Sequence, residues 1–569
     1  MIGLISATAA GAVARDRLAA AWPGRTRVYE GPVREAVGRA FAECEQLVCF
    51  LATGAVVRLI APLLADKASD PGVVCVDEAQ RHAVSLLGGH GGGANELALA
   101  VSEVLGCAPV ITTATDATDV PGLDTLGWPV EGATATVTRA ILDGTPVTLE
   151  ADAVWPLPPL PGNVTPAGTG PAADAVLRVT DRVVETGERE VVLRPPSLVV
   201  GVGASKGASV DEVLGLVEET LASAGLSARS VAALATVDAK ADEAGIVGAA
   251  ARLGVPLTTY AAEELARIDV PNPSGAPLAA VGTPSVAEAA ALAGGGELLV
   301  PKRKSAPEGR AAMATCAVVR KEPRGRLAVV GLGPGARDLL TPRAREEIRR
   351  ASVLVGLDQY VDQIRDLLRP GTRVLESGLG AEEERARTAV AEARAGHAVA
   401  LIGSGDAGVY AMASPALAEA SDDIDVVGVP GVTAALAAAA ILGAPLGHDH
   451  VSISLSDLHT PWEVIERRVR AAAEADIVVT FYNPRSRGRD WQLPKALSIL
   501  AEHREPTTPV GVVRNASRPD GTSRLTTIAA LDPTTVDMMT VVVVGNTAAR
   551  EIAGRMVTPR GYRWQTEGS

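Results

Sequence analysis

The chain has 569 residues, far more than a domain of roughly 100 to 200 residues, so several hydrophobic cores are expected. Hydrophobic residues make up 47% of the chain and aromatic residues only 3%, a balance typical of α/β enzymes. The net charge of -14 disfavours a protein whose main task is to bind nucleic acid or anionic lipid, because both tasks need concentrated Lys and Arg.

The cysteines and the first residues favour a cytoplasmic location. The five cysteines are scattered and include no CxxC pair, so we expect neither a disulfide framework nor a metal site built on cysteine. The start, MIGLISATAAGAVARDRLAAAW, lacks the basic leader of a signal peptide. The run VTAALAAAAILGAPLG, from Val432, is shorter than the roughly 20 residues of a membrane span, and we expect it to form a buried helix.

Residues 1–120 alternate short apolar runs with helical patterns. The runs IGLIS, QLVCFLA, VVCVD and APVITTA are strand candidates, and each is followed by a loop and helix-forming sequence. This rhythm predicts a parallel sheet with helices on its faces. The string AVSLLGGHGGGANELA places a glycine-rich turn before a helix, and we expect its backbone amides to hold a carboxylate at the helix N-terminus. A purely structural turn is the alternative.

The middle of the chain contains a loosely patterned region and a second small domain. Between 121 and 196 the pattern weakens, and WPLPPLPGNVTPAGTGP is too rich in Pro and Gly for regular structure, so it is expected to be a surface loop or linker. Residues 197–320 resume strand, loop and helix patterns, beginning with SLVVGVGASKG, and predict a small α/β domain. The polar KEPRG, Lys321 to Gly325, marks the main boundary.

Residues 326–550 again predict an α/β fold, with two successive subdomains, and 551–569 form a tail. Several predicted strands end in small or turn-forming residues, where a ligand lies in an open α/β sheet. The rival interpretation of GLGPG, Gly331 to Gly335, is a dinucleotide loop, but GxGxxG requires a later third glycine. The strand-end motifs are GLGPG, GSGDAGVY, PGVTAA, FYNP, RNA and GNT.

In this order the motifs closely resemble the tetrapyrrole methylase family, which transfers methyl groups from S-adenosylmethionine to corrin precursors. The longer strings GSGDAGVYAMASP, SISLSDLHTPWE and FYNPRSRGR are similar to the precorrin-3B C(17)-methyltransferase branch. The resemblance covers 326 to 550 and implies methylation of C-17 with ring contraction, on a metal-free or cobalt-containing substrate. It also implies a homodimer.

The resemblance further implies which residues bind the cofactor. S-adenosylmethionine is a cation with a ribose and an adenine, so its pocket needs backbone polar groups, close approach and few positive charges. Small residues in the strand-end loops supply these properties. The resemblance places the following residues at the cofactor: Pro334 and Gly335 at its border; Ser404, Gly405, Asp406 and Val409 at its methionine or ribose part; Thr433 and Ala434 beside it; Asn483 and Ala516 on the adenine side.

Ring contraction needs more side-chain chemistry than methyl transfer, because the sulfonium of the cofactor is already activated. Asp457 and His459 suit proton transfer, and Arg485, with Arg487 and Arg489, can pair with the acetate and propionate arms of the substrate. A solvated loop is the alternative for the arginines. The spacing of His448, His450 and His459 matches no recognised zinc pattern, so no metal site is expected.

The first 320 residues resemble the cobalt-precorrin-5A hydrolase family, which opens a ring lactone and releases a two-carbon aldehyde. The resemblance rests on the glycine-rich string AVSLLGGHGGGANELA and on ALATVDAKADEAG, VPNPSGA, VGTPSVAEAAAL and ELLVPKRKS. His90 and Glu96 are acid-base candidates, and Arg58 is a candidate for binding a carboxylate. His90 is alternatively a hydrogen-bonded turn residue.

One loop departs from that family. The family usually carries GxGCR, whereas this chain reads GVGASKG from Gly201, with Ala204 and Ser205 in place of Cys and Arg. The departure leaves open a non-catalytic first half that binds or delivers a tetrapyrrole. The sequence thus predicts a fused corrin-ring enzyme that acts on a small tetrapyrrole and not on nucleic acid or membrane.

Overall fold

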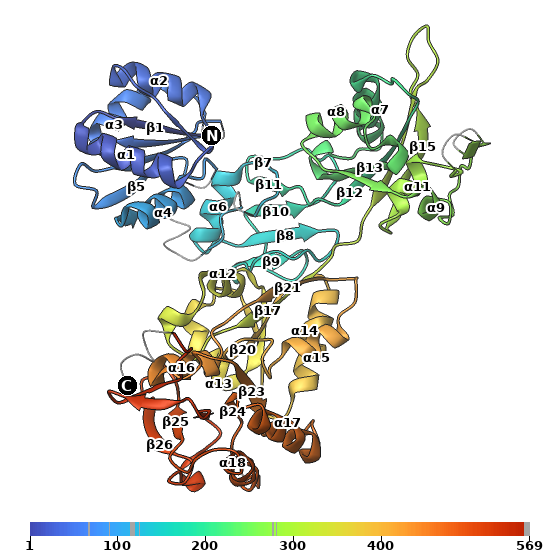
Figure 1. Cartoon of the computed structure of the whole chain (residues 1–569). Coiled ribbons are helices and arrows are strands. Elements are labelled where there is room, and N and C mark those ends of the chain that lie inside the picture. Colours follow the sequence, from blue (N-terminus) through green and yellow to red (C-terminus); the bar gives the residue numbers. More distant parts are fainter. Residues whose placement is uncertain are drawn as a thin grey trace. The chain divides into compact units, whose positions relative to one another are not determined.

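The computed structural model describes residues 1–66, 69–89, 91–113, 120–123, 126–275, 278–279, 282–486 and 488–562 (Figure 1). The chain divides into two compact units. The first comprises Met1–Ala153 and Leu160–Pro323, and the second comprises Val154–Pro159 and Arg324–Ser569. Within the described ranges, no helix is long and apolar enough to cross a membrane.

The first sheet has helices on both faces, as the alternating pattern predicted. Helices α1 and α4 pack on one face through Leu18 and Val101, whereas α2 and α3 pack on the other through Val37 and Val56. Strand β5 runs antiparallel to β4, so the sheet is not fully parallel. The sheet order is β2 (Thr26–Val28), β1 (Ile2–Ser6), β3 (Gln46–Phe50), β4 (Gly72–Val76), β5 (His82–Leu87), β6 (Ala108–Val110); the helices are α1 (Ala9–Ala21), α2 (Val33–Glu43), α3 (Thr53–Ile60) and α4 (Ala94–Leu105).

The region 121–196, for which the sequence predicted loose structure, contains a five-stranded sheet and the helix α6 (Thr134–Leu142). Its strands have only three to five residues, and Pro-rich and Gly-rich loops separate them, so no long periodic pattern reveals them. The loop Val154–Pro159 belongs to the second unit. The sheet order is β7 (Val130–Gly132), β11 (Glu190–Leu193), β10 (Ala175–Val179), β8 (Val147–Ala151), β9 (Val164–Pro166).

The third sheet forms the last part of the first unit. Strands β12, β13 and β14 are parallel, and β15 and β16 form an antiparallel pair beside β12. Helices α7 and α8 cover one face, and α11 covers the other. The bounds are β12 (Leu198–Ala204), β13 (Val231–Val237), β14 (Leu257–Tyr260), β15 (Glu297–Lys304), β16 (Ala314–Arg320), α7 (Val210–Ser223), α8 (Ala244–Leu253), α9 (Ala262–Leu265) and α11 (Ala287–Leu292).

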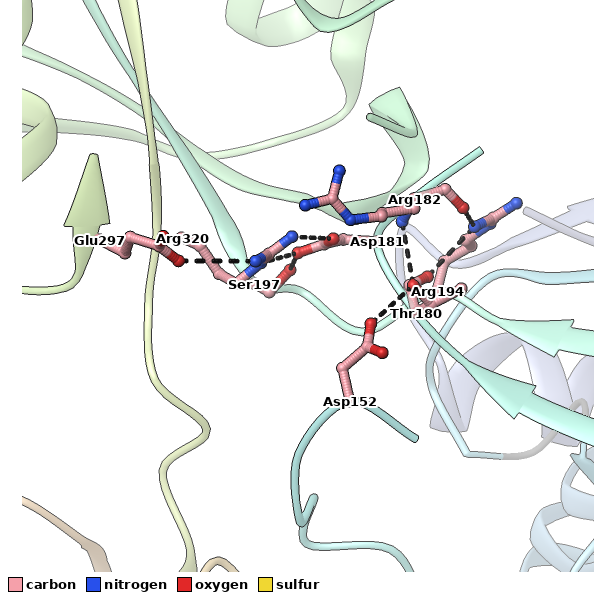
Figure 2. Close-up of polar contacts among 8 residues, drawn as sticks. All are labelled: Asp152, Thr180, Asp181, Arg182, Arg194, Ser197, Glu297 and Arg320. Atoms are coloured by element: carbon pink, nitrogen blue, oxygen red, sulfur yellow. Dashed lines mark hydrogen bonds and ion pairs between the residues drawn. The ribbon is translucent and has the colours of Figure 1, made fainter. Parts of the chain in front are cut away.

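A buried ion pair joins the middle sheet to the third sheet. Figure 2 shows Asp181, which follows β10, facing Arg320 at the end of β16. Both guanidinium contacts measure 2.7 Å, and the Ser197 hydroxyl donates to the same carboxylate at 2.8 Å. Burial alone would raise the pKa of Asp181, but the hydrogen bonds from Arg320 and Ser197 hold it below its ordinary value. The Asp181 carboxylate is therefore ionised and paired in the folded chain at neutral pH.

The second unit has two five-stranded sheets and a small C-terminal sheet. All strands of the first are parallel, and the second is mixed. Their orders are β19 (Arg373–Ser377), β18 (Val353–Leu357), β20 (Ala398–Gly403), β17 (Arg326–Gly331), β21 (Asp425–Val429), and β23 (His450–Ser454), β24 (Val478–Tyr482), β27 (Thr540–Val544), β25 (Pro509–Arg514), β26 (Thr522–Thr527). The helices are α12 (Pro342–Arg350), α13 (Asp358–Ile364), α14 (Glu382–Arg394), α15 (Ala413–Glu419), α16 (Ala434–Leu442), α17 (Trp462–Glu474) and α18 (Gln492–Ala501).

The first residues of the predicted tail form regular structure. Strands β28 (Arg550–Ile552) and β29 (Arg555–Val557) form a hairpin, and β29 pairs with β22 (Gly443–Ala444) after helix α16. Met556 is fully buried in the core beside Leu442, so burial of this side chain anchors the hairpin.

Candidate functional site

Three loops meet at the carboxyl ends of β17, β20 and β21, which are neighbouring parallel strands. The amides and carbonyls of Gly333 and Gly405 bond to each other at 3.0 and 2.8 Å. Gly431 lies so close that a Cβ atom on it would be 2.1 Å from the Gly405 carbonyl oxygen. Any side chain at Gly431 would therefore push the loops apart. Three of the six strand-end motifs of the sequence, GLGPG, GSGDAGVY and PGVTAA, therefore lie together at this edge.

Asp406 connects two of these loops. Its Oδ1 accepts the Gly408 amide at 2.8 Å, and its Oδ2 accepts the Gly431 amide at 3.1 Å. The Val409 amide bonds to the Asp406 carbonyl at 3.2 Å. These contacts match the turn-forming role that Asp commonly has after a strand. An ionised carboxylate accepts about four hydrogen bonds, so Asp406 retains acceptor capacity.

Two residues that sequence reasoning missed contact the expected cofactor positions. Tyr360 forms a side-chain hydrogen bond with Ser404, and burial raises the pKa of Tyr360 above its ordinary value. Arg518 Nε donates to the Pro334 carbonyl at 3.2 Å, and its side chain covers Gly335, where a Cβ would lie 2.8 Å from Arg518 Cγ. Arg518 thus places a cation beside the glycine loop.

Tyr482, at the end of β24, connects the second sheet to helix α16. Its hydroxyl lies 2.5 Å from Thr433 Oγ1 and accepts the Ala435 amide at 2.8 Å. Ala434 is the first residue of α16, so Tyr482 caps this helix from another sheet. The Tyr410 ring lies 5.2 Å from the Tyr482 ring, and its hydroxyl donates to the Ser452 carbonyl at 2.7 Å.

The strand ends of the second sheet hold strained backbone. The Asn483 side chain donates to Ser454 Oγ at 3.1 Å, and Ala516 is buried in the turn after β25. Seven non-glycine residues in the described ranges have positive φ; Asn483, Asn515 and Ser517 lie in these loops, and Tyr410 lies in the loop after β20 of the first sheet. Such strain clusters at ligand-binding sites, where the surrounding structure maintains it.

The predicted catalytic residues of this unit each have different surroundings. Asp457 accepts a hydrogen bond from Gln492 Nε2 at 3.0 Å, whereas His459 is exposed. Arg485 donates to the Thr534 carbonyl at 2.7 Å, and Arg489 is buried. These two arginines contact neighbouring loops, so they do not form the freely solvated cluster of the alternative. Arg487 lies outside the described residues.

A pocket of about 280 Å³ opens beside the loops after β20 and β21. Asp406, Gly408 and Pro430 line one side, and the rest of the lining is mainly apolar, including Leu417 and Val426. Of the ten residues expected at the cofactor, only Asp406 lines this pocket. The other nine lie in the loops after β17, β20, β21, β24 and β25, and these loops are the better candidate because ligands of open α/β sheets bind at such strand ends.

In the first unit, the glycine-rich turn serves mainly to pack the backbone. A Cβ on Gly92 would lie 2.7 Å from the Gly72 nitrogen, so β4 and the turn are in direct contact. The amides of Ala94 and Asn95, expected to hold a carboxylate, instead bond to the carbonyls of Gly88 and Gly89 at 3.1 and 2.9 Å. These two donors are therefore used within the turn, and a carboxylate site at its other amides stays a prediction.

The predicted catalytic residues of the first unit are not joined in the structure. Glu96 and Arg58 are both exposed, and Arg58 donates to the Gly54 carbonyl of its own helix at 2.9 Å. Among the residues that the structure describes, no hydrogen bond or ion pair links Arg58 to Glu96. His90 lies outside them.

The GVGASKG loop, which departs from the resembled family, has a defined anchor. Its Gly207 amide donates to Glu243 at 2.8 Å, and Glu243 also pairs with Lys240 at 3.2 Å. Ser205 and Lys206 are exposed, while Ala204 is half-buried. The loop is therefore held by its backbone, and its side chains face solvent.

Three family models match the chain in succession. The Cobalamin synthesis G N-terminal model matches residues 35–116, and the Cobalamin synthesis G C-terminus model matches 198–319. The model of the Tetrapyrrole (Corrin/Porphyrin) Methylases matches 326–532. The order agrees with the two resemblances predicted from sequence.

Relatives in curated proteins match the second half of the chain. A probable cobalt-factor III C(17)-methyltransferase of Salmonella typhimurium is 46% identical over 42% of this chain and 99% of its own length. A precorrin-3B C(17)-methyltransferase of Sinorhizobium is 41% identical over 42% of this chain and 97% of its own length. Several longer relatives are matched over less than half of their length.

Among solved structures, the crystal structure of the methyltransferase CobJ is 38% identical, over 41% of this chain and 100% of that chain, with a TM-score of 0.39. The Salmonella and Sinorhizobium relatives are covered almost completely at more than 40% identity. The chain therefore belongs to the tetrapyrrole methylase family, and a region that matches both cobalamin synthesis G models precedes its methylase part.

Proposed function

We propose that residues 326–550 methylate C-17 of precorrin-3B, or of its cobalt-containing form, with contraction of the corrin ring during cobalamin biosynthesis. The methyl donor is S-adenosylmethionine. The observation that carries this proposal is the meeting of the loops after β17, β20 and β21 at one strand edge, in a chain whose relatives carry C(17)-methyltransferase names.

The residues at this edge fit S-adenosylmethionine. Close packing of Gly431 on Gly405 leaves backbone and small side chains at this edge, which permits close approach of a ligand. The Asp406 carboxylate retains acceptor capacity for the amino or ribose groups of the cofactor. Arg518 offers a cation beside Pro334, where it suits the carboxylate of the methionine part. When bound, the cofactor supplies an activated methyl group, so the chain itself mainly has to position its reactants.

In this proposal the cofactor loops have separate tasks. Ser404, held by Tyr360, and Thr433, held by Tyr482, present hydroxyls toward the methionine and ribose parts. Asn483 and Ala516 border the adenine from the second sheet. Asp457 exchanges the protons of ring contraction, and its contact with Gln492 keeps its carboxylate oriented. His459 and Arg485 contact the carboxylate arms of the substrate.

The test is mass spectrometry of products from the full chain, incubated with S-adenosylmethionine and either metal-free or cobalt-containing substrate. The proposal expects one added methyl group on one of the two substrates. The substrate that is converted identifies the metal state. If the full chain methylates neither substrate, the proposal is contradicted.

We propose that residues 1–320 open the ring lactone of cobalt-precorrin-5A and release a two-carbon aldehyde. Both cobalamin synthesis G models match within this region, which supports an enzyme over a pure binding module. Glu96, His90 and Arg58 remain its proposed catalytic residues. The full chain is incubated with lactone-containing substrate and assayed for aldehyde. Tight binding without release would favour the binding module instead.

The proposal includes a cytoplasmic homodimer that binds no nucleic acid. Light scattering of the full chain tests the dimer, and a mass of one chain at micromolar concentration would contradict it. A gel-shift titration with mixed DNA and RNA tests whether the chain binds nucleic acid. The net charge of -14 predicts no shift at physiological salt.

A further inference from the structure

Gln492 contacts Asp457 and Arg489 lies within reach of its charge, and each of these two buried side chains retains an unfilled hydrogen-bonding group. Gln492 is 2% exposed, and its Nε2 donates to Asp457 Oδ2 at 3.0 Å. An ionised carboxylate only accepts hydrogen bonds, so the amide nitrogen must face Asp457 and the amide oxygen must point away. That oxygen, Gln492 Oε1, is buried without a hydrogen-bond partner among the described residues.

Arg489 is the second such side chain. It is 9% exposed, its Nε donates to Ser486 Oγ at 3.3 Å, and its Nη2 contacts Met538 Sδ at 3.6 Å. Its remaining nitrogen, Nη1, is buried without a partner in the described part of the chain. Burial lowers the pKa of Arg489, and the negative charge of Asp457 partly offsets this effect. The two groups therefore lie close enough to interact electrostatically.

This arrangement costs stability. A buried cation with an unfilled donor and a buried amide with an unfilled acceptor both lose hydration that the protein does not replace. Arg504 shows the contrasting structural use of a buried arginine in the same unit. It is 5% exposed and its Nε is also buried without a partner among the described residues, but both of its terminal nitrogens donate to carbonyls, those of Gly545 and Ile477, at 2.7 and 2.6 Å. Arg504 holds strand and helix ends together. The Arg489 side chain instead contacts a hydroxyl and a thioether, neither of which carries a charge.

We infer that Arg489 and Gln492 form, beside Asp457, a receptor for a neutral oxygen group of the macrocyclic substrate that accepts and donates hydrogen bonds at once. A hydroxyl or a protonated carboxyl has this chemistry: its oxygen accepts from Arg489 Nη1, and its proton is donated to Gln492 Oε1. The Asp457 charge disfavours an ionised carboxylate in the same place. The inference rests on the proposed methyltransferase, and it adds a positioning pair that fixes the substrate relative to Asp457.

The location supports a substrate rather than a cofactor contact. Asp457 follows β23 and Arg489 follows β24, and these strands are parallel neighbours whose carboxyl ends share one edge. Eight of the ten expected cofactor positions, among them Asp406 and Gly335, belong instead to loops of the first sheet of this unit, whereas Asn483 and Ala516 lie at the second sheet. The receptor thus occupies the second sheet's edge, which is expected to border the cofactor only at Asn483 and Ala516 and otherwise remains for the acceptor molecule.

The experiment compares the full chain with Arg489→Met and Gln492→Leu. It measures the KM for the tetrapyrrole, its binding by absorbance titration in the presence of S-adenosylhomocysteine, and the thermal midpoint. Each substitution is expected to weaken tetrapyrrole binding and raise KM by about 10- to 100-fold, because a buried partner of the ligand is lost. Binding of S-adenosylhomocysteine should be unchanged, and the thermal midpoint should hold or rise, because an unpaired buried group has been removed.

Arg504→Met is the matched control, and it should lower the thermal midpoint while leaving tetrapyrrole affinity of the folded chain intact. Two outcomes overturn the inference: unchanged tetrapyrrole binding in Arg489→Met, or a lowered midpoint with unchanged KM, which would make Arg489 structural like Arg504. The binding titration separates this failure from failure of the proposed function. If the full chain binds the tetrapyrrole without methylating it, the proposed function fails, while weaker binding by Arg489→Met still supports the receptor.

Discussion

The two units use tightly packed glycines at the edge of a sheet, but with different consequences. In the first unit, Gly92 packs on Gly72, and the next amides bond to carbonyls within the same turn. In the second unit, Gly431 packs on Gly405, and the loops around it present hydroxyls and a carboxylate at an edge faced by a second sheet. A glycine-rich loop thus indicates close backbone packing, and its surroundings decide whether it can hold a ligand.

Both units contain buried polar groups, and these differ in what they join. In the first unit, the Asp181–Arg320 ion pair joins two sheets through two hydrogen bonds of 2.7 Å, while Arg194 Nε and Ser230 Oγ are buried without a partner among the described residues. In the second unit, Arg489 and Gln492 are buried with unfilled groups at the carboxyl edge of a sheet. A satisfied pair stabilises the fold, whereas each unfilled group costs stability and needs an explanation of its own.

The largest effect is expected on the stability of the first unit when the Asp181–Arg320 pair is removed. Arg320→Met leaves the Asp181 carboxylate buried without its cation, and we expect the free energy of unfolding of the first unit to fall by about 3 to 5 kcal/mol. Denaturation followed by circular dichroism measures the loss. The second unit's methyl transfer at low temperature should persist. A change below about 1 kcal/mol would place the pair among ordinary surface ion pairs.

The same pair predicts a pH dependence. The pKa of Asp181 is lowered in the folded chain, so the pair contributes stability above the unfolded pKa of about 3.9 and loses it as the pH falls through the folded pKa. The difference between wild type and Arg320→Met should therefore be largest at neutral pH and should shrink below about pH 4. Denaturation curves at several pH values measure it. A difference that grows on acidification would contradict the assignment.

Gly431→Ala should disable the cofactor loops of the second unit. The new methyl group would collide with the Gly405 carbonyl and displace two cofactor loops, and a displacement near 1 Å costs roughly 100-fold in rate. Methyl transfer to the precorrin substrate is the readout. Gly428→Ala, on the strand β21 that leads to the Gly431 loop, is the matched control, because no atom lies within 4 Å of its added Cβ. Equal activity of the two variants would contradict tight packing at Gly431.

Gly92→Ala should affect stability rather than methyl transfer. Its Cβ would meet the Gly72 backbone, and such overpacking typically costs about 1 to 3 kcal/mol. Denaturation monitors the first unit, with Gly91→Ala as the control, since its Cβ would have open space around it. Loss of methyl transfer in Gly92→Ala alone would show that the two glycine clusters do not act independently.

The smallest expected effect is that of Asp406→Asn. The amide keeps one acceptor oxygen, so it preserves one of the two loop contacts and removes the charge. We expect affinity for S-adenosylhomocysteine to fall by about tenfold, in line with the loss of one charge-assisted hydrogen bond. Isothermal titration calorimetry measures this affinity. An unchanged affinity would leave Asp406 with only its turn-forming role.

The sequence predicted the α/β class and the shared strand edge because the parallel strands are continuous apolar runs, such as β17 and β20. It missed the middle sheet, whose short strands carry no long period. It also missed contacts across long separations. Arg518 meets Pro334 across 184 residues, and Gln492 meets Asp457 across 35, and no local pattern encodes such pairs.

The direct test of the account is calorimetric titration of S-adenosylhomocysteine into the full chain, Gly431→Ala and Gly92→Ala. The account expects one binding site per chain, lost or strongly weakened in Gly431→Ala and kept in Gly92→Ala. Binding that survives in Gly431→Ala and disappears in Gly92→Ala would place the cofactor in the first unit and contradict the central claim.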